Sequence, residues 1–410
     1  MPKNKPPVRR QPGPRPAPSV DRTDELVEDL AVLALEVAEQ EDGDSAALAA
    51  KRDELHKMVR NALRKKHDEV LYGAIEHARF DDVDAYALLR GEIEEAAASI
   101  VLRSDGKPAE EIDAFLIPMF INSNGGLKRA QAFQDAAGFE LLRASFQQAQ
   151  LEAPSATVVL ISHLYDVDEI DRISYSELNE MLREVAATMG EKKMVATPAL
   201  SGSIAAIDDT EEPQPQADGG PVTELRFLLG FVRRRLDDPF YAVAADGPAA
   251  DAWFAARLER YRQWTLMADT LLRACVASDP NGVAINFLYQ NQFFAARRQA
   301  MAEGDILMLM SQLGAALVEH ALEISQASAV VGPFAQDDDV ALRVALYRNG
   351  DGAPLAHFDL PFDLADQLQD TIDEMCEVLH GMGFGVPSLA TASRFSADGV
   401  PQQRKPYQPE

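Results

Sequence analysis

The feature that most constrains the fold is a recurring order of short apolar runs and amphipathic helical patterns. "ASIVLR" and "AFLIPMFI" precede a helical pattern at 127–150, and "ATVVLISHLY" precedes another at 175–189. "TELRFLLGFVR", "FYAVAA", a helical pattern at 249–275 and "GVAINFLY" repeat this order before a helix at about 305–326. "ALRVALYR", "LAHFDLPF" and a helical 363–381 start it a third time. Short apolar runs between turn residues are typical of strands, so we predict strand–strand–helix–strand–helix units.

This order predicts an α/β fold, with α+β as the alternative. The predicted segments are a helical region at 23–98, a first unit at 99–200, a second unit at 222–336 and a truncated third unit at 337–384. Residues 201–221 are rich in Pro, Gly and acids and are predicted to be a linker. Residues 1–22 and 385–410 are predicted to be disordered tails.

The helical region shows a regular apolar period. After Thr23, a predicted N-cap, apolar residues recur every three or four positions and indicate one helix face: Leu26, Leu30, Leu33 and Val37. Further helical segments are predicted from about Ala46 to Ala78 and from about Val83 to Ala98.

Charge limits the classes of partner. The net charge of the 410-residue chain is −27, yet residues 1–20 carry five Lys and Arg, seven Pro and no acid. Because so acidic a body repels polyanions, we expect no membrane and no nucleic-acid contact except through the basic tail. Only two cysteines, Cys275 and Cys376, are present, and no apolar run approaches the ~20 residues of a membrane span. A cytoplasmic location is expected.

The stretch "SATVVLISHLYDVDEIDR" has the outline of an active site, because an apolar run delivers His163, Asp166 and Asp168. Ser174 and Glu177 predict a capping box, which places these side chains between a strand and a helix. They are candidates for a Mg²⁺ site or for acid–base chemistry. The alternative is a structural histidine beside a solvated loop.

A comparison within the chain favours that alternative. When "VVLISHLY" is matched to "GVAINFLY", His163 corresponds to Phe287, Asp166 to Gln290 and Asp168 to Gln292. A position that accepts Phe in the second unit is typical of packing rather than of catalysis.

A second candidate is the turn Ser123, Asn124, Gly125 and Gly126, which we predict to lead directly into a helix. Free amides at a helix N-terminus bind phosphate, although the stretch matches no P-loop or dinucleotide fingerprint. A plain turn is the alternative. A shared site for a phosphorylated or metal-bound substrate requires this turn and the 163–168 loop to lie at one sheet edge.

Clusters of charge give two interaction candidates. Arg233, Arg234 and Arg235, with Arg297 and Arg298, are a candidate anion site or pair with local carboxylates such as Asp237 and Asp238. Acidic residues also step by three and four along the last predicted helix: Asp363, Asp366, Asp370, Asp373 and Glu377. Like charges at this spacing repel one another, so a cationic partner would stabilise them. The basic tail with Arg9 and Arg10 is one such partner; a solvated helix face is the alternative.

The order of "LVEDLAVLAL", "SIVLRSDGKPAEEIDAFLIPMF", "ISHLYDVDEIDRISYSELNEMLREV" and "LRVALYRNGDGAPLAHFDLPF" resembles an uncharacterised proteobacterial family of unknown function. The resemblance covers roughly residues 24–380, implies a bacterial cytoplasmic protein and carries over no catalytic residue.

The sequence contains no HExxH, paired CxxC, Gly-x-Ser-x-Gly or Walker motif. We therefore predict a regulatory or protein-interaction protein without catalytic activity or cofactor, which binds a protein partner or a second copy. The alternative is a protein or enzyme that binds a phosphorylated ligand or Mg²⁺ through the 122–126 turn and the 163–168 loop.

Overall fold

A computed structural model describes most of the chain. The described residues are 20–39, 46–103, 108–125, 127, 133, 135–190, 222–242, 247–277, 279–336 and 339–408. The predicted tail up to residue 19, with Arg9 and Arg10, lies outside them, as do the predicted linker and Gly126. The chain divides into two compact units, Met1–Leu89 (unit 1) and Arg90–Glu410 (unit 2).

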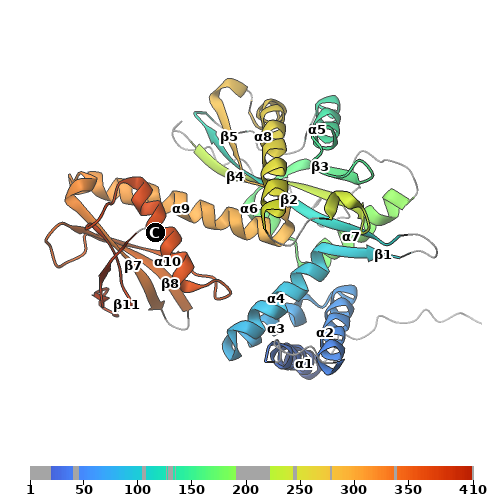
Figure 1. Cartoon of the computed structure of the whole chain (residues 1–410), viewed down its shortest axis with the longest axis horizontal. Helices are drawn as coiled ribbons and strands as arrows, with labels where there is room; N and C mark the ends of the chain where they lie inside the picture. The colour runs from blue at the N-terminus through green and yellow to red at the C-terminus, as the bar shows by residue number, and fades with distance from the viewer. Residues whose placement is uncertain are drawn as a thin grey trace, which may run out of the picture. The chain divides into compact units, whose positions relative to one another are not determined.

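Unit 1 is helical (Figure 1). It contains α1 (Val20–Ala38), α2 (Ala46–Lys65), α3 (Asp68–Asp81) and the start of α4 (Val83–Ala98). Because α1 begins before Thr23, that residue is not its N-cap. The single helix predicted from Ala46 to Ala78 is broken at Lys66, whose φ of 58° is left-handed. This break lets α3 return against α1 and α2, so that Leu30, Leu55 and Leu71 become buried.

Unit 2 begins with a six-stranded sheet. Its strands are β1 (Ser99–Leu102), β2 (Glu110–Ser123), β3 (Thr157–Tyr165), β4 (Val222–Arg235), β5 (Val283–Phe287) and β6 (Asn291–Gln292). β2 and β4 pair antiparallel along their whole length, β3 lies on the outer side of β4, and β1, β5 and β6 pair with the other edge of β2. The central strand order is therefore β5-β2-β4-β3, with all neighbours antiparallel.

Helices α5 (Ala136–Gln148) and α8 (Pro248–Val276) connect β2 to β3 and β4 to β5, and each connection skips one strand. This is the β-α-β-β-α-β order of split β-α-β folds, here with α6 (Val167–Asp171) and α7 (Tyr175–Gly190) inserted after β3. The core under α5 and α8 includes Phe146 and Trp264, whose rings meet edge to face. α9 (Phe293–Glu319) packs on the opposite sheet face, where Gly304 approaches the Phe120 ring.

Two residues adapt the central strands to this packing. The ring of Phe115 covers Gly230 on the paired strand, where a Cβ atom would lie 2.2 Å from the ring. Pro118 lacks an N–H, but β5 ends and β6 begins beside it, and its carbonyl accepts from the Leu288 N–H. The missing donor therefore falls in a gap between two short partner strands.

The prediction of a second strand at "FYAVAA" was wrong. Pro239–Tyr241 form a short 3-10 helix (η1), capped by Asp238, whose carboxylate accepts from the Phe240 N–H at 2.9 Å. "TELRFLLGFVR" is instead the central strand β4 and pairs with "AFLIPMFI". The next helix also starts at Phe293 rather than near 305.

A second sheet completes unit 2, in the order β13-β10-β7-β8-β9. Its strands are β7 (Ala327–Gln336), β8 (Asp339–Arg348), β9 (Ala356–Pro361), β10 (Leu389–Thr391) and β13 (Lys405–Pro406), with β11 (Arg394–Phe395) and β12 (Pro401–Gln402) as a separate pair. α10 (Leu368–Met382) and the C-terminal half of α9 supply its core. Among the described helices, α9 alone is long and apolar enough to cross a membrane.

The prediction of disorder over 385–410 was wrong for the described part of that segment. β10 adds parallel to β7, β13 pairs with β10, and Tyr407 is buried. The segment is ordered because it covers the open edge of β7. The boundary between the second and third predicted units is also shifted. "AVVGPFA" was assigned to the second unit, but it forms β7 in the middle of this sheet.

Candidate functional site

In the predicted site around His163, the side chains of His163 and Asp166 contact neighbouring residues of the same segment. His163 Nε2 lies 3.0 Å from Glu169 Oε1, and its ring meets Tyr165 edge to face. Asp166 caps α6: its carboxylate accepts from the Glu169 N–H, and the Glu169 carboxylate accepts from the Asp166 N–H, both at 2.8 Å. Asp168 is exposed on the same helix. The segment expected to be a loop is thus a short helix.

The capping box at Ser174 and Glu177 was correctly predicted. The Glu177 carboxylate accepts from the Ser174 N–H at 3.0 Å, and the Ser174 hydroxyl accepts from the Glu177 N–H at 3.3 Å. α7 begins at Tyr175, as expected.

Among the described residues, the first helix after the turn at the end of β2 is α5. Ser123 Oγ accepts from the Gly125 N–H at 3.1 Å, and the Asn124 N–H donates to the Gly282 carbonyl. α5 begins only at Ala136, because Asp135 caps it by accepting from the Ala137 N–H. The N-terminal amides of α5 are therefore not next to the turn in the sequence.

The structure does not bring the two predicted sites together. Ser123 pairs with Val222 and Tyr165 pairs with Phe227, on opposite sides of β4. Five residues separate these positions along β4, or about 17 Å. Within the described part of the chain, no group of three or more His, Cys, Asp or Glu side chains is placed to hold a metal ion. The described residues therefore offer no ligand set for the Mg²⁺ alternative.

The arginine cluster at the end of β4 is paired with carboxylates. Arg233 binds Glu110 at 2.5 Å, and Arg234 binds Glu111 at 3.0 Å and Asp113 at 2.7 Å. Arg235 binds Asp237 at 2.9 Å, as the sequence suggested. The other partners lie on the paired strand β2 and are not local in sequence. Arg297 and Arg298 also pair, with Asp171 and Glu94.

The predicted acidic stripe does not lie on one helix, because α10 starts only at Leu368. Asp363 precedes it and is held by Arg90, whose Nη1 lies 2.6 and 2.8 Å from its two carboxylate oxygens. Asp366 also precedes α10, and Asp370 lies in its first turns. Asp373 accepts from the Gln369 amide at 3.1 Å. The stripe therefore divides into carboxylates with different surroundings.

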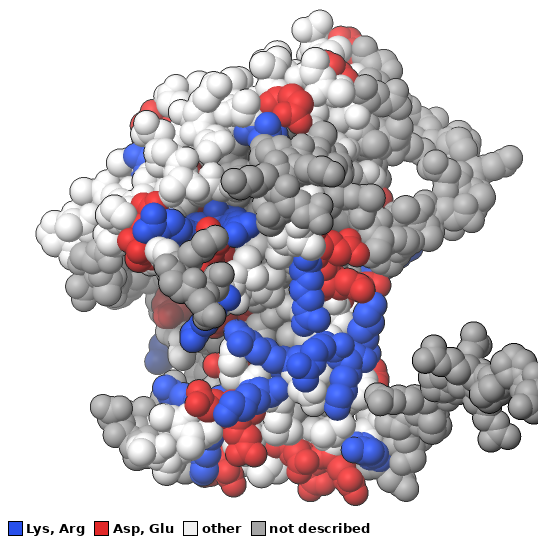
Figure 2. All heavy atoms as spheres, turned by 90° about the vertical axis from the view of Figure 1, so that its right-hand side faces the viewer, with Lys and Arg blue, Asp and Glu red and all other residues white. Residues whose placement is uncertain are grey.

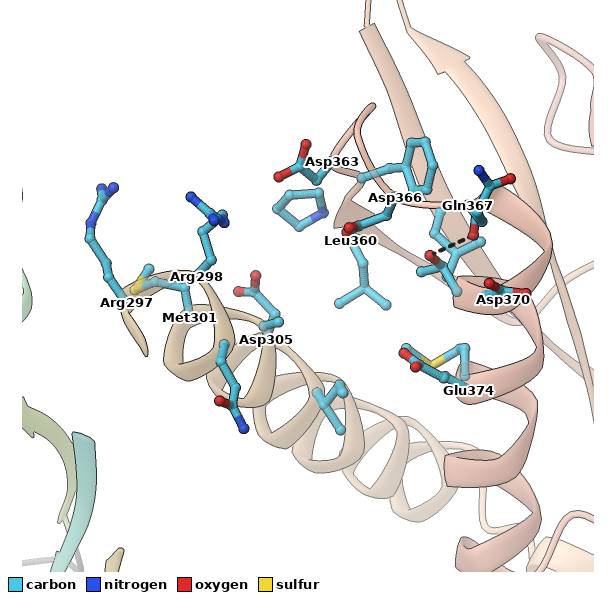
Figure 3. Close-up of a pocket in the computed structure, with 18 residues that line it drawn as sticks. Arg297, Arg298, Met301, Asp305, Leu360, Asp363, Asp366, Gln367, Asp370 and Glu374 are labelled. Atoms are coloured by element: carbon cyan, nitrogen blue, oxygen red, sulfur yellow. Dashed lines mark hydrogen bonds between the residues drawn. The ribbon is translucent and has the colours of Figure 1, made fainter. Parts of the chain in front are cut away.

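Three of the five acids of the predicted stripe line a cavity of about 660 Å³ between α9 and α10, which we name the acid-lined cavity. These are Asp363, Asp366 and Asp370. Asp305 of α9 and Glu374 of α10 also line it, and Figure 3 shows Asp305 and Asp366 pointing into it from opposite walls. The apolar part of the lining comes from Met301, Ile306, Leu342, Leu360 and Met375.

Negative charge in the acid-lined cavity is only partly neutralised. Arg90 pairs with Asp363, while Arg297 and Arg298 at its rim are bound to Asp171 and Glu94. Asp305, Asp366, Asp370 and Glu374 make no ion pair with any described residue. Burial raises the pKa of Asp305, and burial together with the neighbouring Asp363 raises the pKa of Asp366. A bound cation would therefore stabilise both carboxylates.

The sequence had marked Asp363, Asp366 and Asp370, but not Asp305 or Glu374. An acid inside the apolar stretch "MAEGDILMLM" was the available signal for Asp305. Cys376, next to the cavity residue Met375, is buried, and burial raises the pKa of its thiol to about 12. That thiol is therefore not a nucleophile at neutral pH.

No curated protein and no solved structure matches this chain. Residues 21–352 match the family model described as "Protein of unknown function (DUF2863)". Since this match covers most of the chain, the protein belongs to that family.

Proposed function

We propose that this protein is a non-catalytic interaction protein of the bacterial cytoplasm, which binds a cationic polypeptide segment in the acid-lined cavity. The observation that carries the proposal is the pair Asp305 and Asp366, two carboxylates of raised pKa that enter one cavity and form no ion pair with a described residue, although Arg90 and Arg298 lie near Asp366. A lysine or arginine side chain placed between Asp305 and Asp366 can form charge-assisted hydrogen bonds with both carboxylates.

The lining favours a peptide over a bare ion. Its volume of about 660 Å³ lies within the usual ~300–1,000 Å³ of ligand pockets. Met301, Ile306 and Leu360 provide apolar contact for the aliphatic stem of a basic side chain and for its neighbours. A cationic segment with Pro or Val between its charges combines both kinds of contact. The stretch "KNKPPVRRQPGPR" at residues 3–15 has this composition.

The test is a fluorescence anisotropy titration of a labelled peptide with the sequence of residues 1–20 against the full chain. We expect Asp305→Asn/Asp366→Asn to weaken binding at least tenfold, or about 1.4 kcal/mol. Asp373→Asn/Glu377→Gln is the matched control, because it also removes two negative charges and neither residue lines the cavity. Equal affinity of the wild type and the double variant contradicts the proposal.

Two further arms sharpen this test. Because protonation of Asp305 and Asp366 removes the attraction, affinity should decline as the pH falls, and it should do so at a higher pH than for aspartates of ordinary pKa. A chain with Arg9→Gln/Arg10→Gln tests whether the protein's own tail competes with the labelled peptide for the cavity. If the tail competes, this variant should bind the labelled peptide more tightly than the wild type does. Tighter binding at lower pH would argue against a carboxylate site.

A further inference from the structure

Helix α2 of unit 1 presents a row of exposed cations that the sequence interpretation did not single out. Lys57, Arg60 and Arg64 step by three and four and so share one helix face, with Lys65 beside them. The buried face of α2 is formed by Leu48, Leu55, Val59, Ala62 and Leu63. Figure 2 shows Lys and Arg side chains gathered over the N-terminal helices of this otherwise acidic protein.

The row has no partner within the described residues. None of Lys57, Arg60, Arg64 and Lys65 forms an ion pair with a described carboxylate, and Arg64 donates only to the neutral Asn61 amide. Lys51, one turn before Leu55, does pair with Glu36 at 3.2 Å. The α2 row therefore differs from Lys51 on the same helix.

Helix stability does not account for the row. Cations in the last turn interact favourably with the helix dipole, which explains Arg64 and Lys65. This effect fades beyond the last turn, so it does not extend to Lys57. Like charges three and four residues apart also destabilise a helix by ~0.2–0.5 kcal/mol per pair. A row of this kind is stabilised by an external anion.

The residues around the α2 row indicate which class of anionic partner it binds. Insertion into a membrane interface needs an exposed apolar helix face, and the large apolar residues of α2 are buried or, in the case of Met58, half-buried. The centre of a protein–protein interface is enriched in aromatic and apolar side chains, yet none of the exposed large hydrophobic residues belongs to α2. A surface that offers charge alone is typical of contact with a phosphate backbone.

We propose that the α2 row binds the phosphate backbone of a nucleic-acid duplex. Steps of three and four residues place the cations ~4.5 and ~6 Å apart along the helix axis, while each DNA strand carries one phosphate per ~3.4 Å. At physiological salt, charges more than ~8 Å from the contact are largely screened. Residues 1–20 add five cations to the same unit.

The experiment is an anisotropy titration of a fluorescein-labelled 20-base-pair DNA duplex of mixed sequence with the full chain between 50 and 200 mM NaCl. Four phosphate contacts predict that log Kobs falls with log[NaCl] at a slope of about −3 to −4, which is roughly a hundredfold loss over this range. Lys57→Gln/Arg60→Gln/Arg64→Gln should reduce the slope to about −1, and Arg60→Gln alone should reduce its magnitude by about one.

A matched control removes three arginines that are already paired with carboxylates: Arg143→Gln/Arg235→Gln/Arg348→Gln. It loses the same charge and should bind as the wild type does. Circular dichroism and thermal melting confirm that both triple variants are folded. Lack of wild-type binding at 50 mM NaCl overturns the proposal, as does equal loss in the two triple variants. Two further results overturn the proposal: a loss of DNA binding that occurs only in Arg9→Gln/Arg10→Gln, or an affinity for poly-L-glutamate equal to that for the DNA duplex.

Discussion

Several arginines of unit 2 form ion pairs with carboxylates, whereas a row of cations on α2 in unit 1 does not. Arg233, Arg234 and Arg257 each bind a carboxylate that another segment of the chain supplies. Lys57 and Arg60 on α2 have no such described partner, although the chain carries 66 acids against 39 Lys and Arg. Other described cations, such as Arg183 and Arg262, also form no ion pair with a described carboxylate, so what distinguishes α2 is that its unpaired cations share one helix face. Paired arginines hold the fold together, and unpaired ones are free to contact something else.

The largest expected effect concerns the most buried of these pairs. Arg257 on α8 binds Glu152 at 2.9 Å, and both residues are more than 90% buried. Arg257→Met leaves Glu152 as an uncompensated buried charge and should cost about 3–5 kcal/mol. Guanidinium unfolding of the full chain measures this loss. Arg257→Met/Glu152→Leu should recover much of the lost stability. A loss below about 1 kcal/mol in the single variant would show that Arg257 is not needed to compensate the buried charge of Glu152.

A second prediction concerns the carboxylate side of a pair. Burial raises the pKa of Asp113 to about 6 from 3.8, although Arg234 opposes the shift. The folded state thus favours protonated Asp113, and ionisation destabilises the protein as the pH rises through about 6. Asp113→Asn resembles the protonated form, so relative to wild type it should gain about 2 kcal/mol between pH 4.5 and pH 7.5.

Denaturant midpoints of both proteins across this pH range measure that difference. Glu111→Gln is the control, because Glu111 also binds Arg234 but its side chain is 19% exposed, against 8% for Asp113. A pH-independent difference between wild type and Asp113→Asn would mean that Arg234 fully compensates the buried charge.

The smallest stability effect is expected on α2. Lys57→Gln/Arg60→Gln should leave the free energy of unfolding within ~0.5 kcal/mol of wild type, or raise it slightly, because like-charge repulsion is removed. Thermal melting in low salt, where repulsion is strongest, is the suitable measurement. A clear loss of stability would show that these cations have a structural partner, and the contrast between the two units would disappear.

Part of the candidate site could be predicted from sequence. Periodic acids marked Asp366 and Asp370, which do line the acid-lined cavity. Asp305 was not marked, because it is 61 positions from Asp366 and approaches it only when α9 packs beside the connection from β9 to α10. The basic row of α2 was visible in "LHKMVRNALRKK", but its lack of partners was not.

The capping box of α7, the span of α4 and the pairing of Arg235 with Asp237 followed from the sequence by itself, because each depends on contacts within a few residues. Only the tertiary structure decided that "TELRFLLGFVR" is the central partner of "AFLIPMFI", that residues after Ser388 complete the second sheet, and that Arg90 neutralises Asp363. Strand pairing and ion pairing between distant segments depend on which surfaces meet once the chain is compact. Neither apolar periodicity nor local charge spacing encodes that choice.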